Sequence, residues 1–290
     1  MSDSAWDDAC FVLGPHRSGT TVLTRSLADS GEFVYLTAAD IVARHRGPDQ
    51  VESTLGKLVE RKETRLIDST EISKDLPEEY GFVLPGRRLT EETAPQLDSV
   101  YRDLGGKSDR PRRFLLRNPW DLTSTGLIHR LFPRAVFVFT VRDPVATIDS
   151  QVRAARTLYG APSDYHALLD PRYRLLIERR MRFAFYGWVS SRRVLVARLI
   201  KGFQLSTDKL VRDLEDLPRD RWIAVRYEDL VREPEKELSR AYGFLGLPTA
   251  GIARVAGGIR PTERPLEPHV KARIRQIRER TRLYREAFGY

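Results

Sequence analysis

Short hydrophobic runs alternate with longer amphipathic stretches along the chain. Each run is rich in β-branched and aromatic residues, and each is followed by a segment with helical character. Because the runs are almost continuously apolar, they fit strands buried on both faces, as in a parallel sheet. The predicted strands are Cys10 to Leu13, Phe33 to Leu36, Phe114 to Leu116, Val136 to Val141 and Trp222 to Tyr227. We therefore predict an α/β fold: a central parallel β-sheet of about five strands with helices on both faces.

Helix start and stop signals lie between the predicted strands. A helix is expected over Thr20 to Ser30, and Pro144 and Pro234 each stand at a suitable first helical position. The stretch from Arg172 to Lys201 is strongly helical, but polar residues interrupt it too often for a membrane span. A last helix is expected over about Glu267 to Phe288, with one apolar face.

Two segments depart from this alternation. Residues 43–112 combine mixed charge with several glycine and proline pairs and carry only a weak strand or helix signal, which predicts an insertion on the sheet. Residues 248–268 contain Gly257-Gly258 and four prolines, which predicts a flap-like loop. We predict one domain over residues 1–290, in which both segments and the stretch from Arg172 to Lys201 surround a substrate pocket.

Composition excludes several classes of protein. The chain of 290 residues has one cysteine, Cys10, so an intramolecular disulfide and a cysteine-based metal site are excluded. The acidic N-terminus, Met1 to Ala9, and the absence of a long apolar run lead us to expect a cytoplasmic protein without a membrane span. The formal net charge of +9 raises the question of a polyanionic partner, although solvated surface arginines explain it equally well. The oligomeric state is open.

The first predicted strand leads through a loop, Gly14-Pro15-His16-Arg17-Ser18-Gly19-Thr20-Thr21, directly into a helix. The first N–H groups of a helix have no intrahelical partner and lie at the positive end of its dipole, so this geometry suits an anion. The loop supplies a glycine for close approach, three hydroxyl groups and a guanidinium: Gly19, Ser18, Thr20, Thr21 and Arg17. The lysine of the nucleoside triphosphatase loop is missing, which favours a phosphate ligand other than a magnesium-bound triphosphate.

The eight-residue string resembles the 5'-phosphosulfate loop of sulfotransferases that use 3'-phosphoadenosine 5'-phosphosulfate (PAPS), particularly the bacterial and tyrosylprotein-type branch of the P-loop sulfotransferases. The resemblance runs with gaps from about Ala9 to Pro248 and is weakest over residues 43–112. It implies a P-loop-type sheet, PAPS as the sulfuryl donor, no requirement for a metal, and a small-molecule acceptor. A hydroxyl acceptor is preferred to an amine.

Further segments match the family in order and imply the rest of the nucleotide site. Val136 to Val141 ends in Arg142-Asp143-Pro144, and Ser150 follows; the resemblance implies that Arg142 and Ser150 hold the 3'-phosphate. The alternative is a surface Arg–Asp pair and a serine inside a helix. Tyr227 would stack on the adenine or hydrogen-bond to it, unless it is a packed core tyrosine. His16 and Arg260 complete the expected nucleotide-binding set.

The resemblance also implies how charge on the leaving phosphate is neutralised. In the segment Leu116 to Trp120, Arg117 stands where relatives generally carry a lysine beside the bridging oxygen of the leaving group. Arginine keeps the charge but is effectively never deprotonated, so it can stabilise charge electrostatically without donating a proton. Arg17 would share this catalytic role.

The base for the acceptor proton has several candidates. Tyrosylprotein-type relatives carry a glutamate after the first helix, and here only Asp40 is near that position. The string Pro77-Glu78-Glu79-Tyr80-Gly81-Phe82 resembles an acidic segment of bacterial members, which makes Glu78 and Glu79 the preferred candidates, although adjacent carboxylates are usually only solvated. His16 is a further option.

Two rival functions follow from the same sequence. A P-loop small-molecule kinase or nucleotidyl transferase would bind ATP with magnesium, but the missing lysine argues against it. A basic nucleic-acid-binding module would need interleaved basic and aromatic residues or a recognition-helix motif, and the sequence has neither. We therefore expect no nucleic-acid partner.

Overall fold

A single parallel sheet of five strands lies at the centre of the computed structural model, which describes residues 9–106, 113–260 and 264–290. The strand order is β2-β3-β1-β4-β5. The strands are β1 (Cys10–Leu13), β2 (Phe33–Tyr35), β3 (Arg113–Arg117), β4 (Val136–Val141) and β5 (Trp222–Arg226). The five predicted strands are confirmed, with ends that shift by at most one residue. Of the acidic N-terminus, only Ala9 lies within the described residues. Residues 107–112 and 261–263, which belong to the two irregular segments, lie outside them.

Strand β1 occupies the middle of the sheet and sets the position of the loop that follows it. Cys10 lies beside Leu115 of β3 on one side and beside Val136 of β4 on the other. All pairings are parallel, so the carboxyl ends of β1, β3 and β4 meet at the same edge. Open α/β sheets bind ligands at this edge.

Each face of the sheet carries its own hydrophobic core. Side chains alternate along β1: Phe11 and Leu13 belong to the larger core, and Cys10 and Val12 belong to the smaller one on the opposite face. The smaller core is closed by residues from helices α2, α12, α13 and α14. The larger core is closed mainly by α3, α5, α7, α11 and the C-terminal helices. The predicted helices on both faces are therefore confirmed.

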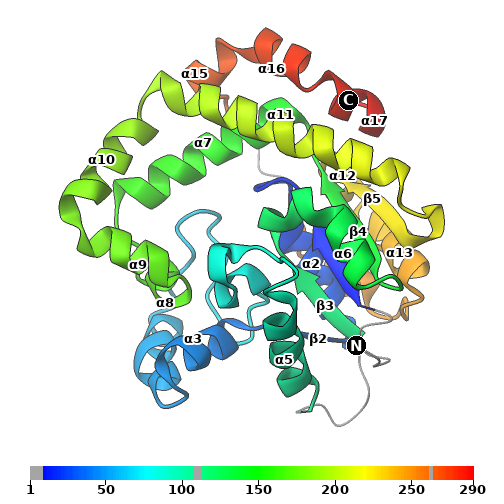
Figure 1. Ribbon diagram of the computed structural model, residues 1–290, viewed down its shortest axis with the longest axis horizontal. Helices are drawn as coiled ribbons and strands as arrows, with labels where there is room; N and C mark the ends of the chain where they lie inside the picture. The colour runs from blue at the N-terminus through cyan, green and yellow to red at the C-terminus, as the bar shows by residue number, and fades with distance from the viewer. Residues whose placement is uncertain (1–8, 107–112, 261–263) are drawn as a thin grey trace.

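The helices follow the predicted order (Figure 1). The α-helices are α2 (Thr20–Ala28), α3 (Ala38–Arg46), α4 (Lys57–Glu60), α5 (Ala94–Gly105), α6 (Thr125–Leu131), α7 (Pro144–Gly160), α8 (Asp164–Leu169), α9 (Pro171–Glu178), α10 (Arg180–Ser190), α11 (Arg193–Glu215), α12 (Tyr227–Arg232), α13 (Pro234–Leu245), α14 (Ile252–Ala256), α15 (Pro268–Lys271), α16 (Ile274–Arg280) and α17 (Arg282–Phe288). The short 3-10 helices are η2 (Tyr80–Val83), η3 (Pro85–Arg87), η4 (Pro119–Ser124) and η5 (Arg219–Arg221), and η1 (Glu52–Gly56) is a π-helix. Pro144 and Pro234 begin α7 and α13, as predicted.

The prediction of one continuous helix near the C-terminus is wrong. The backbone leaves the helical region at Arg273 and Thr281, so the segment forms α15, α16 and α17. Its apolar face is nevertheless present, because Val270, Ile277 and Tyr284 are fully buried against the larger core. Hydrophobic spacing therefore identified the buried face but did not reveal the two interruptions.

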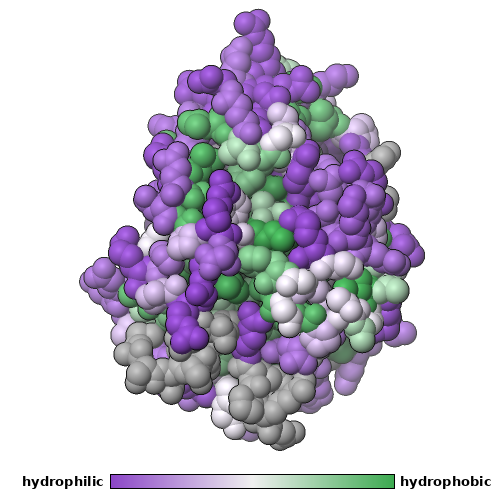
Figure 2. Space-filling model, turned by 90° about the vertical axis from the view of Figure 1, so that its right-hand side faces the viewer, coloured by the Kyte–Doolittle hydropathy of each residue, from purple (hydrophilic) through white to green (hydrophobic). Residues whose placement is uncertain are grey.

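The outer surface is largely hydrophilic on the side shown in Figure 2, where hydrophobic residues are visible in a band between hydrophilic ones.

The helical stretch from Arg172 to Lys201 forms α9, α10 and the start of α11. Within the described ranges, no helix combines the length and hydrophobicity needed to cross a bilayer.

Candidate active site

The loop after β1 folds tightly because two of its glycines have no room for a side chain. A Cβ atom on Gly14 would lie 2.2 Å from Thr140 Oγ1 of β4, and one on Gly19 would lie 2.5 Å from Tyr227 Cδ2. Gly19 also has a φ of 100°, a left-handed conformation that favours glycine. Gly19 is the N-cap of α2, and no side chain in the described part of the chain caps this helix. The first N–H groups of α2 are therefore available to a ligand.

This loop borders a cavity of about 1080 Å³, which we call the large cavity. Nine of the ten residues predicted to bind the nucleotide line it: His16, Arg17, Gly19, Thr20, Thr21, Arg142, Ser150, Tyr227 and Arg260. The remaining one is Ser18. Its hydroxyl is buried and forms a 2.7 Å hydrogen bond with the hydroxyl of Thr140, so the structure does not bring it to the large cavity.

Direct contacts join the residues that sequence analysis assigned to the two phosphates. Arg17 Nε donates a hydrogen bond to Ser150 Oγ at 3.3 Å, and Arg142 Nη1 donates to the backbone oxygen of Arg17 at 3.1 Å. The Arg142 guanidinium also lies 4.2 Å from the centre of the Tyr227 ring. Arg17 lies in the loop after β1, and Arg142 directly follows β4. Ser150 lies on α7, and Tyr227 begins α12. All four residues meet at the carboxyl edge of the sheet.

A second cavity of about 500 Å³ adjoins the large one. Both cavities are lined by His16, Arg65, Ile67 and Glu79. The walls of the second cavity are rich in aromatic and aliphatic side chains from α7, α9 and α10, together with arginines. Sequence analysis placed the stretch from Arg172 to Lys201 around a pocket but named none of these side chains, because only the packing of the three helices brings them together.

The loop over residues 248–268 borders the large cavity through Val255, Gly258, Ile259, Arg260, Arg264 and Leu266. None of its described residues lines the second cavity. The loop therefore borders the large cavity, whereas α9 and α10 border the second cavity that adjoins it.

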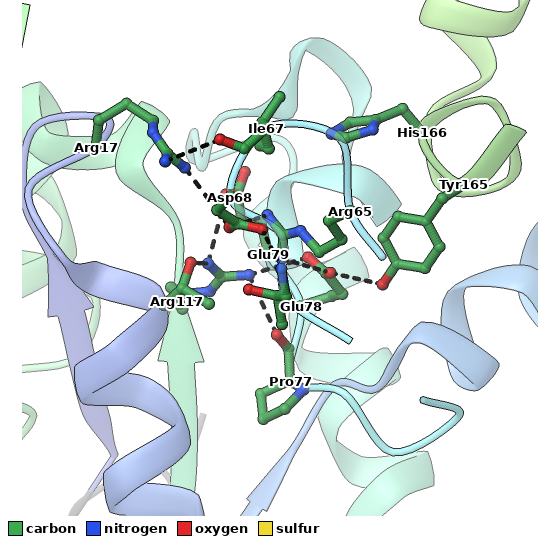
Figure 3. Close-up of polar contacts among 12 residues, drawn as sticks. Arg17, Arg65, Ile67, Asp68, Pro77, Glu78, Glu79, Arg117, Tyr165 and His166 are labelled. Carbon is green, nitrogen blue, oxygen red and sulfur yellow. Dashed lines mark hydrogen bonds and ion pairs between the residues drawn. The ribbon is translucent and has the colours of Figure 1, made fainter. Parts of the chain in front are cut away.

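Arg117 lies at the end of β3 in a buried ion-pair network (Figure 3). Its side chain is 1% exposed. It donates to Thr21 Oγ1 at 2.7 Å and to Glu78 Oε2 at 2.9 Å. Arg117 lines neither cavity, so the structure brings it to the back of the phosphate loop and not to the ligand space itself.

Glu78 is fully engaged in the same network. Its Oε1 accepts hydrogen bonds from Arg65 Nη1 at 3.0 Å and from Tyr165 OH at 2.7 Å, while Oε2 faces Arg117. The residue is buried and lines neither cavity. The Glu78 carboxylate is therefore directed into the ion-pair network and away from the space where a substrate could bind.

Glu79 has a different environment from its neighbour. Its side chain is 14% exposed and lines both cavities, and its Oε1 is 3.8 Å from Arg117 Nη1. Burial raises the pKa of the Glu79 carboxyl above its ordinary value; Arg117 opposes this rise, and the adjacent Glu78 carboxylate adds to it. Glu79 is therefore a carboxylate of raised basicity at the junction of the two cavities.

Asp40 serves the start of helix α3. Its carboxylate accepts hydrogen bonds from the backbone N–H of Thr37 at 3.0 Å and from the Thr37 hydroxyl at 2.6 Å, while Thr37 Oγ1 accepts from the Asp40 N–H. This reciprocal arrangement is a capping box. Asp40 lines neither cavity, so the structure does not bring it together with the other candidate bases.

His16 lies at the junction beside Glu79. Its ring contacts Trp120 edge to face, with ring centres 4.4 Å apart, and its Nε2 has no hydrogen-bond partner among the described residues. Burial lowers the pKa of His16 to about 4, and the nearby arginines Arg87 and Arg17 act in the same direction. The imidazole is therefore neutral at pH 7.

Asp68 and Arg65 belong to the site, although sequence analysis did not single them out. Asp68 Oδ2 lies 3.6 Å from Arg17 Nη1 and 3.4 Å from Arg65 Nη2. Burial alone would raise the pKa of Asp68, but Arg65 and Arg17 outweigh it and hold that pKa below its ordinary value. The only sequence signal for these residues was the mixed charge of the segment 43–112.

Residues 9–184 and 166–251 match the sequence profile of a sulfotransferase family, and together these spans cover most of the chain. The chain belongs to the sulfotransferase family. Among curated proteins, this family member is 27% identical over 274 residues to the omega-hydroxy-beta-dihydromenaquinone-9 sulfotransferase Stf3 of Mycobacterium bovis and of Mycobacterium tuberculosis. The match covers 83% of this chain and 63% of the relative, so the chain spans less than two thirds of the relative's length.

Solved structures of other sulfotransferases share the fold. The sulfotransferase STF9 from Mycobacterium avium superimposes with a TM-score of 0.64 at 16% sequence identity, covering 97% of this chain and 76% of that one. A sulfotransferase from Alicyclobacillus acidocaldarius superimposes with a TM-score of 0.53 at 13% identity, covering 97% and 96%. The predicted P-loop-type α/β fold and the resemblance to the bacterial sulfotransferases are thereby confirmed.

Proposed function

We propose that this protein transfers a sulfuryl group from PAPS to a hydroxyl group of a small-molecule acceptor. The observation that carries this proposal is the junction of the two cavities at Glu79. The large cavity offers groups suited to phosphate, the second cavity is lined by aromatic and aliphatic side chains together with arginines, and a carboxylate of raised pKa borders both. Group transfer between two bound substrates requires such a junction, because the reacting atoms must be held in line at close range.

The residues of the large cavity fit an adenosine 3'-phosphate 5'-phosphosulfate. Thr20, Thr21 and the start of α2 would hold the phosphosulfate with Arg17. Arg142 and Ser150 would hold the 3'-phosphate, and the buried Arg142 Nε, which has no partner among the described residues, is available to an anion.

The adenosine end of the nucleotide would lie near Tyr227 and Arg260, which line the same cavity. The Tyr227 ring packs against Gly19 and the Arg142 guanidinium, which hold it at the wall of the cavity where a base would bind. When bound, PAPS supplies the sulfuryl group, and the chain's own residues supply positioning, charge and the base. These contacts need no metal ion.

Glu79 would accept the proton of the acceptor hydroxyl as that oxygen bonds to sulfur. A raised pKa makes the carboxylate a better proton acceptor, and its position on both cavities gives it access to the acceptor. Arg117 would act without lining either cavity, by orienting Thr21 and stabilising the Glu78–Glu79 segment. Neutral His16 could donate its Nε2–H toward the transferred group, since that nitrogen has no other partner in the described structure.

The second cavity favours a neutral, partly apolar acceptor. Leu158, Tyr159, Tyr173 and Leu176 line it together with arginines, including Arg87. An amine is positively charged at pH 7 and would be repelled by these arginines, whereas a hydroxyl group is neutral. The curated relative Stf3 is named for an omega-hydroxylated dihydromenaquinone, which supports a hydroxyl group as the acceptor.

We also propose that the protein works in a reducing compartment such as the cytoplasm. Its only cysteine, Cys10, is buried in the sheet, and burial raises the pKa of this thiol to about 12. Such a thiol is unreactive toward disulfide exchange.

Thermal unfolding with nucleotides tests the proposed function against the kinase alternative. Adenosine 3',5'-bisphosphate without magnesium should raise the melting temperature by several degrees, because it binds only the folded chain. ATP with magnesium should raise it much less. If ATP with magnesium stabilises the protein more than the bisphosphate does, the proposed donor is wrong and a phosphoryl transferase is favoured.

A further inference from the structure

Helix α10 exposes large hydrophobic side chains on its outer face. Met181 is 89% exposed, Phe185 is 59% exposed and Trp188 is 55% exposed. Their spacing of four and three residues places them on one side of the helix. Figure 1 shows α10 at the outer left edge of the molecule, away from the sheet. Of its eleven residues, only Ser190 is buried, so α10 contributes nothing to either hydrophobic core.

The packing of α10 fixes these side chains toward the outside. A Cβ on Gly187 would lie 2.8 Å from the backbone oxygen of Tyr159, so the glycine face of α10 is held closely against α7. Tyr186 stacks on Tyr159, with ring centres 5.4 Å apart. On the opposite face Phe185 and Trp188 stack on each other, and each is more than half exposed to solvent.

The same segment carries strong positive charge. Residues 179–207 contain seven lysines and arginines and no aspartate or glutamate. Arg180, Arg182, Arg192 and Arg193 are exposed around the aromatic residues, and the Arg192 guanidinium lies 4.6 Å from the centre of the Trp188 ring. Exposed aromatic residues beside arginines, on a helix lying along the surface, are typical of segments that bind the interface of an anionic bilayer.

We propose that α10 and the start of α11 form a docking surface for an anionic lipid membrane. This docking surface consists of Met181, Phe185 and Trp188 with Arg180, Arg192 and Arg193. A second copy of the chain is a poorer occupant, because a symmetric dimer would bring two such positive surfaces face to face without any acidic residue from this segment between them.

The docking surface adjoins the second cavity. Leu175, Arg179, Arg182 and Tyr186 line this cavity, and Leu175 and Tyr186 are also exposed at the surface. Docking would therefore place helix α10, which forms one wall of this cavity, at the lipid interface. Here the inference rests on the proposed function: the acceptor would be an amphiphilic alcohol that enters from the bilayer.

Vesicle co-sedimentation tests the docking surface without requiring turnover. We expect the wild-type chain to bind vesicles of phosphatidylglycerol and phosphatidylcholine and to bind pure phosphatidylcholine at least about tenfold more weakly. Arg180→Glu with Arg193→Glu, and separately Phe185→Ser with Trp188→Ser, should each weaken binding to the anionic vesicles by roughly tenfold or more. These side chains are exposed and line neither cavity, so the variants should fold normally.

Matched controls on other parts of the surface separate a specific site from general charge. Arg130→Glu with Arg254→Glu makes the same change of charge on α6 and α14, and Leu283→Ser removes an exposed apolar side chain from α17. Both controls should retain vesicle binding within about threefold. Equal losses in the controls and the α10 variants would overturn the proposal, as would a dimer in light scattering that Phe185→Ser with Trp188→Ser dissociates.

Turnover with two alcohols distinguishes failure of docking from failure of the proposed function. With PAPS as donor, 2-naphthol serves as a soluble acceptor and octadecanol in anionic vesicles as a bilayer acceptor. The Phe185→Ser and Trp188→Ser variant should lose at least about tenfold in kcat/KM on the bilayer alcohol and little on naphthol. Equal activity of wild type and variant on both alcohols would overturn membrane delivery, whereas vesicle binding without any sulfuryl transfer would overturn the proposed function alone.

Discussion

Glu78 and Glu79 are adjacent in the chain, but their carboxylates lie in different environments. Glu78 is held by Arg117, Arg65 and Tyr165 in a buried network, whereas Glu79 lines both cavities. The backbone N–H of Glu78 donates to the Leu36 oxygen at 2.9 Å, next to the end of β2, which anchors this turn of the chain to the sheet. The two residues therefore differ in position: Glu78 lies in the buried network, and Glu79 faces both cavities.

Glu79→Gln should abolish turnover while leaving affinity for adenosine 3',5'-bisphosphate within a few-fold. The amide keeps the size of the side chain but cannot accept the acceptor's proton, a loss on the order of a hundredfold or more in kcat. Because burial raises the pKa of Glu79, wild-type activity should rise with pH as this carboxyl ionises, and the variant should lack that rise. Steady-state rates and calorimetric titrations measure these effects, and retained activity in Glu79→Gln would remove this residue from the mechanism.

Glu78→Gln provides the matched comparison and should act through stability. Removing this carboxylate leaves Arg117 and Arg65 buried without their shared partner, which costs about 3–5 kcal/mol of unfolding free energy. Chemical denaturation of the two variants should show the loss in Glu78→Gln and only a small change in Glu79→Gln. The reverse order would show that the roles of the two residues have been exchanged.

Arg142→Ala should weaken adenosine 3',5'-bisphosphate selectively. A charge-assisted hydrogen bond contributes about 1.5–3 kcal/mol, so the loss should be about tenfold to a hundredfold. Adenosine 5'-phosphate lacks the 3'-phosphate, and its weaker binding should barely change. Calorimetry on both nucleotides decides the matter: an equal loss for both would show that Arg142 supports Tyr227 and the Arg17 backbone without reading the phosphate.

Most of the fold and most of the residues that line the large cavity beside the loop after β1 could be predicted from the sequence, because both depend on local patterns. Buried strands appear in the sequence as continuous apolar runs. The loop from Gly14 to Thr21 can be recognised from the positions of its glycines and hydroxyl side chains. Ser18 was the exception, since its hydroxyl turns toward Thr140, more than a hundred residues away in the chain.

The acceptor side could not be predicted in the same way, because it depends on long-range packing. Nothing local distinguishes Glu78 from Glu79, and their different roles follow from Arg117 on β3 and Tyr165 on α8. Asp40 matched the expected position in the chain, but the structure uses it as a helix cap. The second cavity arises where α7, α9 and α10 meet, which no spacing along the chain reveals.

Arg117→Lys should retain appreciable activity, whereas Arg117→Ala should lose activity and stability together. A lysine can still pair with Glu78 but cannot bond Thr21, Pro77 and Glu78 at once as the planar guanidinium does. We expect Arg117→Ala to cost about 3–5 kcal/mol of unfolding free energy, since it leaves Glu78 with one arginine fewer in a buried site. Turnover and denaturation of both variants test this, and full stability in Arg117→Ala would show that the ion pair contributes nothing to the fold.

Folding stability should fall as the pH is lowered from about 6.5 toward 4, because two histidines are buried in the neutral form. Burial lowers the pKa of His16 to about 4, and it lowers the pKa of His166, on the wall of the second cavity, to the same value. In the unfolded chain both would titrate near 6.5, so below that pH the unfolded state binds more protons than the folded state. The histidines' contribution to stability is therefore complete above pH 6.5 and is lost as the pH falls toward the folded-state pKa. Each group contributes at most about 1.4 kcal/mol per pH unit across this window.

Denaturation midpoints between pH 7 and 5 test this origin of the pH dependence. His16→Gln and His166→Gln should each flatten the dependence of unfolding free energy on pH, and the double variant should flatten it most. Tyr173→Phe is the matched control: its ring lies 6.0 Å from that of His166, and the change removes the hydrogen bonds of the Tyr173 hydroxyl without removing a group that titrates in this range. Tyr173→Phe should change the unfolding free energy by the same amount at each pH, so that its dependence on pH keeps the wild-type slope. If the double variant keeps the wild-type slope, the loss of stability in acid comes from other groups, and the neutral buried state of the two histidines is disproved.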